Sequence, residues 1–513
     1  MGTPITLKTM KADTRDAVID TLAKTWPLNA RQVYSEVRDT QHLNITYQGV
    51  HKVLNQLVKE KIAVTQDRKY ELDASWIKSL RKFAETADKN YSKAEIAPHL
   101  EIGTGSSVEK DAFTAGKEAA EKALKQIRVN RELQLTLVFS SNIYEKEYNE
   151  VLKGIRAITK DTPLAGCSTV GEIKDRPLKK SVVVAIFAAD KEIFSAETIS
   201  LPVTAEHYAG SGFKDSLDYL EKKAHFGRGF PNIGLIFFPG YTKERGMQTI
   251  APKFLEEFNT RFSDPFSIVG CVAGDDWAFN TTAQFCDEKA MDDIITFVTI
   301  RTTLKFGIRR AHGFNATSEA RYKLKVENDL ITKIAKIQNG KIAEFKPAVD
   351  VYVKETGIPL GELKECLPLF IRELLAKLDK TLPITRVVDG MHGFPCIISG
   401  KSMRFSSPFA NGDIVQISNT TPTDIIRATK NAIHEAEASG GVKNPVAVVL
   451  FSCASLECML NSHQVNEIEK IKTGNLSNVP IFGCYNQGEI GPMAVPQGSG
   501  TVVALVFGNE LRE

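Results

Sequence analysis

The residues best suited to chemistry in this sequence lie in a short frame that occurs three times. Each copy has a proline, a short apolar step, Gly-Cys, a few small or polar residues, and then a glycine followed by an acid. The copies span residues 163–173, 265–276 and 480–490. Thiols, acids and the exposed backbone N–H groups of small residues can all bind polar ligands, so this frame is the first candidate for a functional site.

The first and third copies offer the groups that a zwitterion needs. The backbone N–H groups of Ser168 and Thr169 could hold a carboxylate, as other anion-binding turns do. Glu172 and Glu489 could accept hydrogen bonds from an amino group. A ligand with both charges, such as an amino acid, meets both requirements. The residues that we predict to bind a small ligand are Gly166, Cys167, Ser168, Thr169, Glu172, Cys453, Gly483, Cys484, Tyr485 and Glu489.

The same residues also have a purely structural interpretation, and it stays open. Glycine permits a tight turn, cysteine packs as a small buried apolar side chain, and a glutamate can bond neighbouring backbone N–H groups. Of the three copies, we expect Cys271 to be the packing copy and Cys167 and Cys484 to belong to the site.

Catalysis is not predicted. The segment 166–171 is one residue too long between its serine and its second glycine for a GxSxG nucleophile elbow. A cysteine nucleophile needs a histidine base, and no histidine has diagnostic spacing. No CxxC pair and no histidine cluster with zinc-site spacing occurs, so we predict no metal and no cofactor. The histidines considered are His312, His392, His434 and His463.

The motifs need a scaffold, and the sequence around them repeats as well. A β-type apolar run precedes each Gly-Cys, another follows it, and a helical pattern precedes the whole unit. Each unit therefore predicts helix, strand, helix, Gly-Cys turn and strand, in a repeated α/β module with mixed sheets. Continuous apolar runs are typical of strands buried on both faces. The runs are 135–140, 233–238 and 446–452 before the copies and 182–187, 294–300 and 501–507 after them; the helical patterns are 109–127, 205–224 and 423–438.

The stretch 304–422 does not fit the repeat. Asn339-Gly340 is a strong signal for a β-hairpin, with a strand-like piece on either side. Two helices and three antiparallel strands are predicted after it. The predicted strands are 321–326, 342–345, 395–399, 403–406 and 413–417, and the predicted helices are 347–353 and 367–380.

The first 85 residues resemble a winged helix-turn-helix domain of archaeal and bacterial regulators. Helical patterns cover 13–24, 30–38 and 47–61, with Asn29 and Thr46 as caps of the second and third. A hairpin follows, and a fourth helix begins after it, near Asp73.

That resemblance implies a DNA-binding surface. In the family, the start of the third helix enters the major groove and basic residues of the wing reach phosphates. A winged helix used for dimerisation or protein contact is the alternative. The residues implied in DNA binding are Thr46, Tyr47, Gln48, His51 and Lys52 on the helix and Arg68 and Lys69 on the wing.

Composition and charge limit the class of protein. Apolar residues make up 42% of the 513 residues and charged residues 25%, which is ordinary for a soluble globular protein. The net charge is +3, but residues 1–85 hold 14 Lys and Arg against 10 Asp and Glu, which leaves the remainder at −1. No apolar run approaches the roughly 20 residues that span a bilayer, and no secretory signal pattern is present. Eight cysteines without a disulfide-like pattern indicate reduced thiols, so we expect a cytoplasmic protein without a membrane contact.

Five motifs, in order, resemble the FIST family, named for F-box and intracellular signal transduction proteins. The resemblance covers residues 101–508 and implies a sensory module for small ligands, amino acids among them. Departures from the family pattern at 495–501 and after Cys453 bear on which ligand it binds. The motifs are Gly-Cys-Ser-Thr-Val-Gly-Glu-Ile at 166–173, Gly-Cys-Val-Ala-Gly-Asp-Asp at 270–276, Pro-Ala-x-x-x-Tyr at 347–352, Phe-Ser-Cys-Ala at 451–454 and Gly-x-x-x-x-Gly-Glu-Ile-x-Pro at 483–492.

These inferences combine into one prediction with two alternatives. The predicted domains are a winged helix at 1–85, a linker at 86–100, a FIST N-terminal domain at 101–340 and a FIST C-terminal domain at 341–513. We predict a small-ligand sensor coupled to a DNA-binding winged helix, that is, a one-component transcriptional regulator that binds DNA as a homodimer. The alternatives are a signal-transduction scaffold with a protein partner and, with less support, a thiol-dependent enzyme.

Overall fold

The chain divides into two compact units, Met1–Ala97 and Pro98–Glu513, and each has its own hydrophobic core. Residues 86–97 of the predicted linker lie outside the described residues. The computed structural model describes residues 14–41, 45–83, 98–128, 131–224, 232–242, 249–262, 267–366, 382–388, 390–462, 466–492, 497–498 and 500–512.

The first unit contains the helices and the hairpin predicted for it. Asn29 Oδ1 accepts hydrogen bonds from the N–H groups of Arg31 and Gln32, and Thr46 Oγ1 accepts one from Gly49, so both residues cap helices as predicted. The three strands pair in the order β1-β3-β2. The elements are α1 (Thr14–Lys24), β1 (Leu28–Asn29), α2 (Ala30–Gln41), α3 (Tyr47–Lys59), β2 (Ala63–Gln66), β3 (Lys69–Leu72) and a helix over 74–83.

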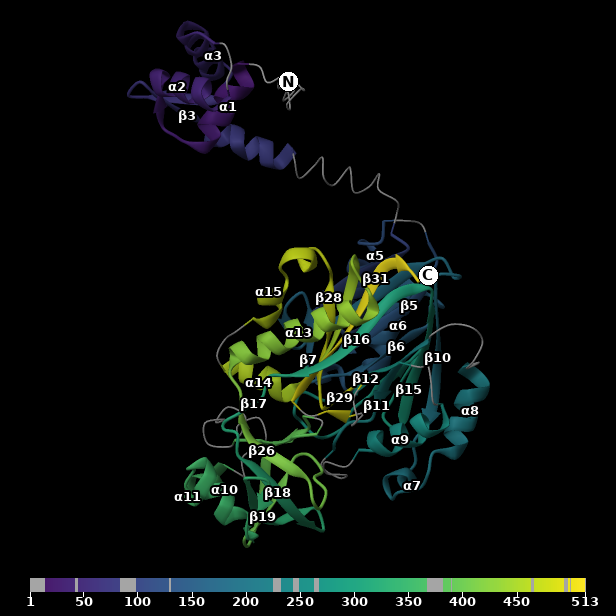
Figure 1. Ribbon diagram of the computed structural model, residues 1–513. Helices are drawn as coiled ribbons and strands as arrows, with labels where there is room; N and C mark the ends of the chain where they lie inside the picture. The colour runs from purple at the N-terminus through teal and green to yellow at the C-terminus, as the bar shows by residue number, and fades with distance from the viewer. Residues whose placement is uncertain are drawn as a thin grey trace. The chain divides into compact units, whose positions relative to one another are not determined.

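Three six-stranded mixed sheets, one for each repeat, form most of the second unit (Figure 1). In each, the Gly-Cys strand pairs in parallel with the strand before it, and that strand pairs antiparallel with the strand after the frame. The first sheet has the order β14 (Lys289–Met291), β13 (Gln284–Cys286), β6 (Leu164–Ser168), β5 (Leu133–Ser140), β9 (Val182–Ala189) and β4 (Leu100–Ser107). The second has the order β10 (Phe194–Pro202), β15 (Ile294–Thr302), β11 (Asn232–Phe238), β12 (Ser267–Val272), β29 (Gly488–Ile490) and β30 (Gln497–Gly498). The third has the order β16 (Leu304–His312), β31 (Thr501–Leu511), β27 (Pro445–Cys453), β28 (Ile481–Asn486), β7 (Gly171–Lys174) and β8 (Pro177–Leu178).

The three sheets exchange strands in a cycle. β7 follows the first Gly-Cys strand but pairs with β28 of the third sheet. β29 follows the third Gly-Cys strand but pairs with β12 of the second sheet. β13 follows the second Gly-Cys strand but pairs with β6 of the first sheet. Each repeat therefore completes the sheet of another repeat.

Gly-Cys lies within a strand in every copy, so the prediction of a Gly-Cys turn is wrong. The neighbouring parallel strand passes so close that only glycine fits before the cysteine. A Cβ at Gly166, Gly270 or Gly483 would lie 1.8 or 1.9 Å from a carbonyl oxygen of that strand. Glycine is required here for close backbone approach and not for a turn.

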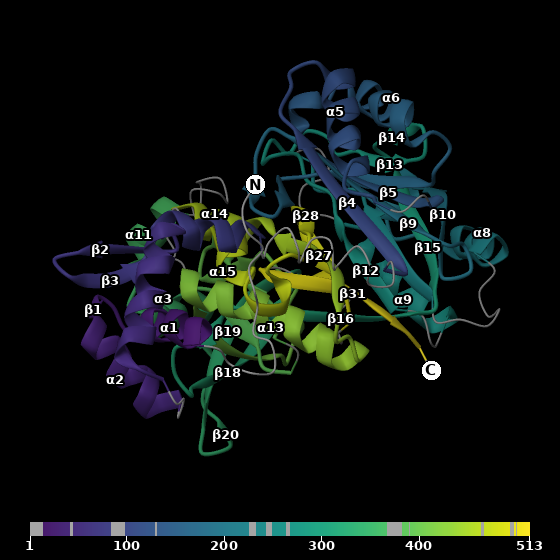
Figure 2. The ribbon, with the colours of Figure 1, turned by 90° about the horizontal axis from the view of Figure 1, so that it is seen from above.

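Helices cover the outer faces of the sheets, and the inner faces of all three sheets share one central core. Figure 2 shows α5 and α6 beside the first sheet and α13 beside β16 and β31. The outer helices are α5 (Ala112–Leu124) and α6 (Tyr148–Thr159) on the first sheet, α7 (Ala205–Tyr208), α8 (Lys214–Ala224) and α9 (Ala251–Arg261) on the second, and α13 (Pro422–Gly440), α14 (Ala454–Ser462) and α15 (Glu467–Ile471) on the third; short 3-10 turns cover Asn142–Tyr144 and Gly474–Leu476.

Two predicted helices need correction. The pattern at 205–224 forms two helices, because Gly210 and Gly212 interrupt it and glycine disfavours a helix interior. The pattern at 109–127 forms a shorter helix that begins after its cap Asp111, whose side chain accepts a hydrogen bond from the Thr114 N–H group. The pattern at 423–438 extends by one residue at its start and two at its end.

A ten-stranded sheet holds the stretch that does not fit the repeat. Asn339 and Gly340 have φ of 47° and 75° and form the predicted hairpin turn. This turn joins β19 and β20, and β19 was not predicted from the sequence. The predicted helix 367–380 lies outside the described residues. The strands are β17 (Asn315–Ala316), β18 (Arg321–Glu327), β19 (Leu330–Gln338), β20 (Lys341–Ile342), β21 (Lys346–Pro347), β22 (Ile384–Arg386), β23 (His392–Gly393), β24 (Pro395–Ser399), β25 (Ser402–Phe405) and β26 (Ile414–Asn419), with helices α10 (Ala348–Thr356) and α11 (Leu360–Cys366).

In the part of the chain that the structure describes, no helix has both the length and the apolar character needed to cross a membrane.

Candidate functional site

The three repeated cysteines meet at the centre of the second unit. The Sγ atoms of Cys167 and Cys271 are 3.8 Å apart, and those of Cys271 and Cys484 are 3.9 Å apart. All three side chains are fully buried. They meet because each occupies the same position on an inward-facing strand of its sheet. The structure therefore does not separate Cys271 from the two cysteines that we expected to form the site.

Three phenylalanines lie next to the cysteines on the neighbouring parallel strands. Phe139, Phe237 and Phe451 are the register partners of the three cysteines. Their ring centroids are 6.2 Å apart in every pair, with edge-on geometry. The cysteines and phenylalanines together fill the position where the three sheets converge.

The residues opposite the cysteines on the exchanged strands are two glutamates and one glutamine. Glu172 pairs with Cys484, and Glu489 pairs with Cys271. In the second copy the residue opposite Cys167 is Gln284, and not the predicted acid Asp275. Asp275 instead accepts hydrogen bonds from the N–H groups of residues 279 and 280 in the loop before β13. The third acid of the frame is therefore a loop residue.

Glu172 is buried, and protein donors occupy both of its oxygens. Oε1 accepts a hydrogen bond from Thr169 Oγ1 at 2.5 Å, and Oε2 accepts one from Ser181 Oγ at 2.6 Å and one from its N–H group at 3.2 Å. Burial raises the pKa of Glu172 to about 7, against the opposing effect of these hydrogen bonds. This carboxyl links the third sheet to the first, and protein donors already bond both of its oxygens.

The N–H groups predicted to hold a carboxylate are also occupied. The N–H of Ser168 donates to the Ala283 carbonyl at 2.8 Å, and that of Thr169 donates to the Ser140 carbonyl at 3.0 Å. Ser168 Oγ accepts a hydrogen bond from the Ala283 N–H at 2.9 Å. These groups hold the strands together and do not form an anion-binding turn.

Glu489 occupies the equivalent position but is only half satisfied. Oε2 accepts hydrogen bonds from Thr501 Oγ1 at 2.6 Å and from the Thr501 N–H at 3.3 Å, the counterparts of the two bonds from Ser181. Oε1 is buried and accepts no hydrogen bond from the described residues. Burial raises the pKa of Glu489 to about 8, and the hydrogen bonds from Thr501, the nearby charge of Arg310 and the Cys453 thiol, a weak donor, lower it in part.

Further polar groups surround Glu489. His312 is the register partner of Thr501, and Asn486 is that of Cys453. The ring of His392 lies 5.5 Å from that of His312 between centroids. Burial lowers the pKa of His392 to about 3, so this ring is neutral at pH 7. We call Arg310, His312, His392, Cys453, Asn486, Glu489 and Thr501 the Glu489 cluster.

Several atoms of the Glu489 cluster are buried without a hydrogen-bond partner among the described residues. They include Nε2 of His392 and Nδ2 of Asn486 as well as Oε1 of Glu489. Nδ1 of His392 lies 3.0 Å from the Gly390 carbonyl, which makes Nδ1 the donor and leaves Nε2 as an acceptor. A buried polar atom without a partner costs roughly 1–3 kcal/mol, so such a group of atoms needs a reason.

Two models of known protein families match the second unit of the chain. Residues 134–336 match the FIST N domain, and residues 348–492 match the FIST C domain. The chain carries both FIST domains. FIST domains are sensory domains of signal transduction, and we call the second unit, which contains both matches, the FIST region. The FIST N match includes the first two Gly-Cys strands, and the FIST C match includes the third.

One curated relative is similar to this chain over part of its length. An uncharacterized protein of Methanocaldococcus jannaschii is 21% identical over 338 residues, which cover 64% of this chain and 61% of the relative. The chain thus matches about three-fifths of the length of that curated relative.

The FIST region has a second polar group on the outer face of the third sheet. The hydroxyl of Tyr485 donates to Glu467 Oε1 at 2.7 Å, and Thr429 donates to Oε2 of the same carboxyl at 3.3 Å. Tyr485 therefore faces α15, away from the Glu489 cluster, although we predicted it with the ligand-binding residues. Burial raises the pKa of Glu467 to about 7.

Sequence reasoning missed Arg310, Asn486 and Thr501. Arg310 carried one usable signal, because a charged residue in an otherwise apolar strand needs a buried partner. Asn486 and Thr501 became visible only through strand pairing. His312 and His392 were considered as catalytic bases, and the structure brings them together with Cys453 and Glu489.

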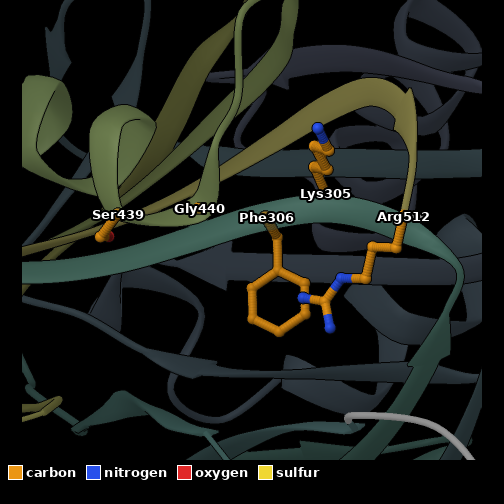
Figure 3. Close-up of a pocket in the computed structure, with 5 residues that line it drawn as sticks. All are labelled: Lys305, Phe306, Ser439, Gly440 and Arg512. Atoms are coloured by element: carbon orange, nitrogen blue, oxygen red, sulfur yellow. The ribbon is translucent and has the colours of Figure 1, made fainter.

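A cavity of about 330 Å³ lies elsewhere in the FIST region (Figure 3). Lys305, Phe306, Ser439, Gly440 and Arg512 line it. The guanidinium of Arg512 lies 4.3 Å from the centroid of the Phe306 ring, and its Nε donates to the Leu304 carbonyl at 3.0 Å. None of the predicted site residues lines this cavity.

The predicted DNA-binding residues lie on one helix and one hairpin of the first unit. Val50, Leu54 and Leu57 bury one face of α3, which leaves Thr46, Tyr47, Gln48 and Lys52 exposed on the other. His51 is partly buried and lies 3.1 Å from Asn55 through Nδ1. Arg68 and Lys69 are exposed at the tip of the β2–β3 hairpin, where Asp67 and Arg68 form the two-residue turn.

Proposed function

We propose that this protein is a one-component regulator whose FIST region binds a small zwitterion, such as an amino acid, at the Glu489 cluster. Its first unit would be a winged helix that binds DNA as a homodimer. The cytoplasmic location predicted from the sequence is part of this proposal. No metal or cofactor takes part in this function.

One observation carries the ligand site: Oε1 of Glu489 is buried and has no hydrogen-bond partner among the described residues, while the equivalent oxygen of Glu172 has one. An ammonium group of a ligand would supply the missing donor. Burial raises the pKa of Glu489 to about 8, and the positive charge of the ammonium would favour the ionised carboxylate. Charge-assisted hydrogen bonds of this kind are shorter and stronger than neutral ones. The unpartnered Oε1 thus fits an amino group better than an apolar ligand.

The rest of the Glu489 cluster suits the other end of a zwitterion. Arg310 lies near enough to act on the pKa values of both Glu489 and His392 through its charge. A guanidinium binds a carboxylate with two parallel hydrogen bonds, and the Asn486 amide could add a further donor. The unprotonated Nε2 of His392 would accept from a ligand N–H or O–H group.

A binding role fits these groups better than catalysis. Burial raises the pKa of the Cys453 thiol to about 12, so it is protonated at pH 7. The thiolate is the nucleophilic form of cysteine, and a thiol with this pKa supplies almost none.

Support for DNA binding comes from the first unit. Three helices, a hairpin and the sheet order β1-β3-β2 suit a winged helix. Its third helix presents a polar face with Gln48 and Lys52, and the hairpin tip carries Arg68 and Lys69. A ligand would regulate DNA binding only through different affinities for two states of the chain, since equal affinities shift no equilibrium.

The ligand site is tested by thermal unfolding of the full chain with each of the common amino acids. A ligand at about 100 times its dissociation constant stabilises the folded state by about 2.7 kcal/mol, which raises the melting temperature by a few degrees. Glu489→Gln should abolish the response, and the matched control Glu172→Gln should retain it. A response that both variants keep would place the ligand elsewhere. No response in a folded protein would favour the interaction scaffold.

The DNA part is tested by fluorescence anisotropy with duplex DNA of mixed sequence at several salt concentrations. Affinity should fall with salt, with a log–log slope of about −0.9 for each phosphate contact. Lys52→Ala and Arg68→Ala should weaken binding and reduce the slope, and Lys24→Ala at the end of α1 is the matched control. The absence of salt-dependent binding at low ionic strength would reject this part of the proposal and leave the ligand site untouched.

A further inference from the structure

Backbone geometry explains the repeated glycines, but it does not explain the cysteines that follow them. The glycines are fixed by the close neighbouring strand. Two residues before each cysteine, the inward-facing positions hold Ala165, Val269 and Phe482, which differ widely in size. The inward-facing position two residues earlier thus accepts apolar side chains of different sizes. The position where the three sheets converge holds a cysteine in all three strands. What the three cysteines share is contact with one another.

The geometry of the three sulfurs matches that of a thiolate metal site. Three sulfurs at 2.3 Å from one ion, the usual zinc–thiolate length, lie about 3.8 Å apart at tetrahedral angles and about 4.0 Å apart in a plane. The Sγ–Sγ distance is 3.8 Å between Cys167 and Cys271 and 3.9 Å between Cys271 and Cys484, and all three sulfurs lie within 4.8 Å of one another. An ion at the centre would need little movement of any strand.

We infer that Cys167, Cys271 and Cys484 form a three-coordinate site for Cu(I). Thiolates are soft ligands and select Cu(I), zinc or iron–sulfur clusters. Zinc in structural sites takes four ligands. Among the described residues, no fourth His, Cys, Asp or Glu atom joins the three sulfurs. A trigonal set of sulfurs in an apolar core therefore suits Cu(I) better than zinc. This inference does not depend on the proposed ligand site.

A buried amide lies beside the proposed site. Asn486 follows Cys484 by two residues on β28, so the two side chains are on the same face of the strand. Its Oδ1 accepts a hydrogen bond from the Gly488 N–H at 3.0 Å, which orients the amide, and its Nδ2 has no hydrogen-bond partner in the part of the chain that the structure describes. An N–H donor next to a metal-bound thiolate is a common second layer of such sites.

The test is metal binding by the full chain under anaerobic, reducing conditions. Protein produced in medium with added copper is passed through a desalting column, and its copper and zinc contents are measured. Cu(I) is then titrated against the chelator bathocuproine disulfonate, and X-ray absorption counts the sulfur ligands. We expect one Cu(I) per chain with three sulfurs in the first shell. Cys271→Ser should reduce the copper content at least tenfold, and Cys286→Ser, a buried cysteine outside the triad, should leave it unchanged.

Three results would overturn the inference. One is the loss of all copper from the wild-type protein at the first chelator addition, which would mean that the sulfurs only pack. Another is equal copper binding by Cys271→Ser, which would place the ion elsewhere. The third is retention of zinc but not copper. If Cys271→Ser does not fold, Cys271→Ala provides the second variant, and the sulfur count in the wild-type protein decides independently of both.

Discussion

Glu172 and Glu489 occupy equivalent positions of the FIST region but differ in one hydrogen bond. Each lies opposite a central cysteine. Each accepts hydrogen bonds from the N–H and hydroxyl of one residue at the start of the next long strand, Ser181 just before β9 or Thr501 as the first residue of β31. The difference is at Oε1, which Thr169 satisfies in the first case and no described residue satisfies in the second.

That difference separates a structural acid from a candidate binding acid within one frame. The position equivalent to Thr169 in the third copy is Asn486, whose Oδ1 bonds the Gly488 N–H instead of the carboxyl. A repeated motif thus does not imply a repeated role. The second copy goes further, because Gln284 replaces the acid and Ile294 stands where the other copies have Ser181 and Thr501.

The largest expected effect comes from removing each carboxyl in turn. Glu172→Ala leaves three donors unpaired and a cavity, and should reduce the free energy of unfolding by about 4 kcal/mol. Glu489→Ala leaves only the two donors of Thr501 and should cost about 2 kcal/mol. Chemical denaturation of the full chain, followed by the FIST-region transition, measures both. Equal losses would mean that the open oxygen makes no difference to stability.

The pH dependence of stability should follow the raised pKa values of the two acids. Their folded-state pKa values, about 7 and about 8, exceed the ordinary value of 4.5 because of burial. The folded state then holds more protons, so stability is greatest below pH 4.5 and falls as pH rises to 7 and 8. Each acid should contribute on the order of 3 kcal/mol to this loss.

The two glutamine variants separate the contributions of these acids to the pH dependence. Glu489→Gln should remove the fall in stability between pH 7 and 8, and Glu172→Gln should leave that part unchanged. Melting temperatures across pH 4 to 9 provide the measurement. Stability that instead rises through this window would show that both carboxyls are ionised in the folded protein.

The second copy lacks both the buried acid and its hydroxyl partner, so this pair can be rebuilt there by mutation. Gln284→Glu buries an acid opposite Cys167 without a hydroxyl partner and should cost about 2 kcal/mol. Adding Ile294→Thr supplies the hydroxyl that the other copies have, and the double variant should recover about 1 kcal/mol relative to the sum of the single changes. A double-mutant cycle of unfolding free energies measures this coupling. Strict additivity would show that the acid and hydroxyl do not meet in this copy.

The sequence predicted the strand before and the strand after each Gly-Cys frame, and most helices of the repeat, because runs such as 135–140 and 446–452 are long, apolar and well bounded. It missed the Gly-Cys strands themselves. Gly166 and Gly483 were predicted to bind a ligand, and a tight turn was the structural alternative; the structure gives both glycines a structural role, but the reason is a close strand and not a turn. The sequence could not predict strand exchange, since an apolar pattern shows that a strand is buried but not which strand it pairs with. The pairing of Glu172 with Cys484 depends on that exchange.

The same limitation explains the errors at the candidate site. Asp275 matched the motif in sequence, yet a loop separates the Gly-Cys strand from β13, so Gln284 takes the equivalent position. Arg310 and Asn486 enter the Glu489 cluster only through sheet register. Tyr485 was predicted in the site from its place next to Cys484, but neighbours in a strand face opposite sides.

The smallest expected effect gives the most direct test of the comparison between Glu172 and Glu489. Thr169→Val removes only the donor to Oε1 of Glu172 and keeps the shape of the side chain, so it should cost about 1 kcal/mol of unfolding free energy. It should also make the first acid resemble the second, with one oxygen left open. Thr501→Val is the matched control, because its hydroxyl bonds Oε2 of Glu489 and its loss leaves that acid with only an N–H donor. If Thr169→Val costs nothing, the Oε1 bond does not distinguish the two acids, and the assignment of ligand binding to Glu489 loses its structural basis.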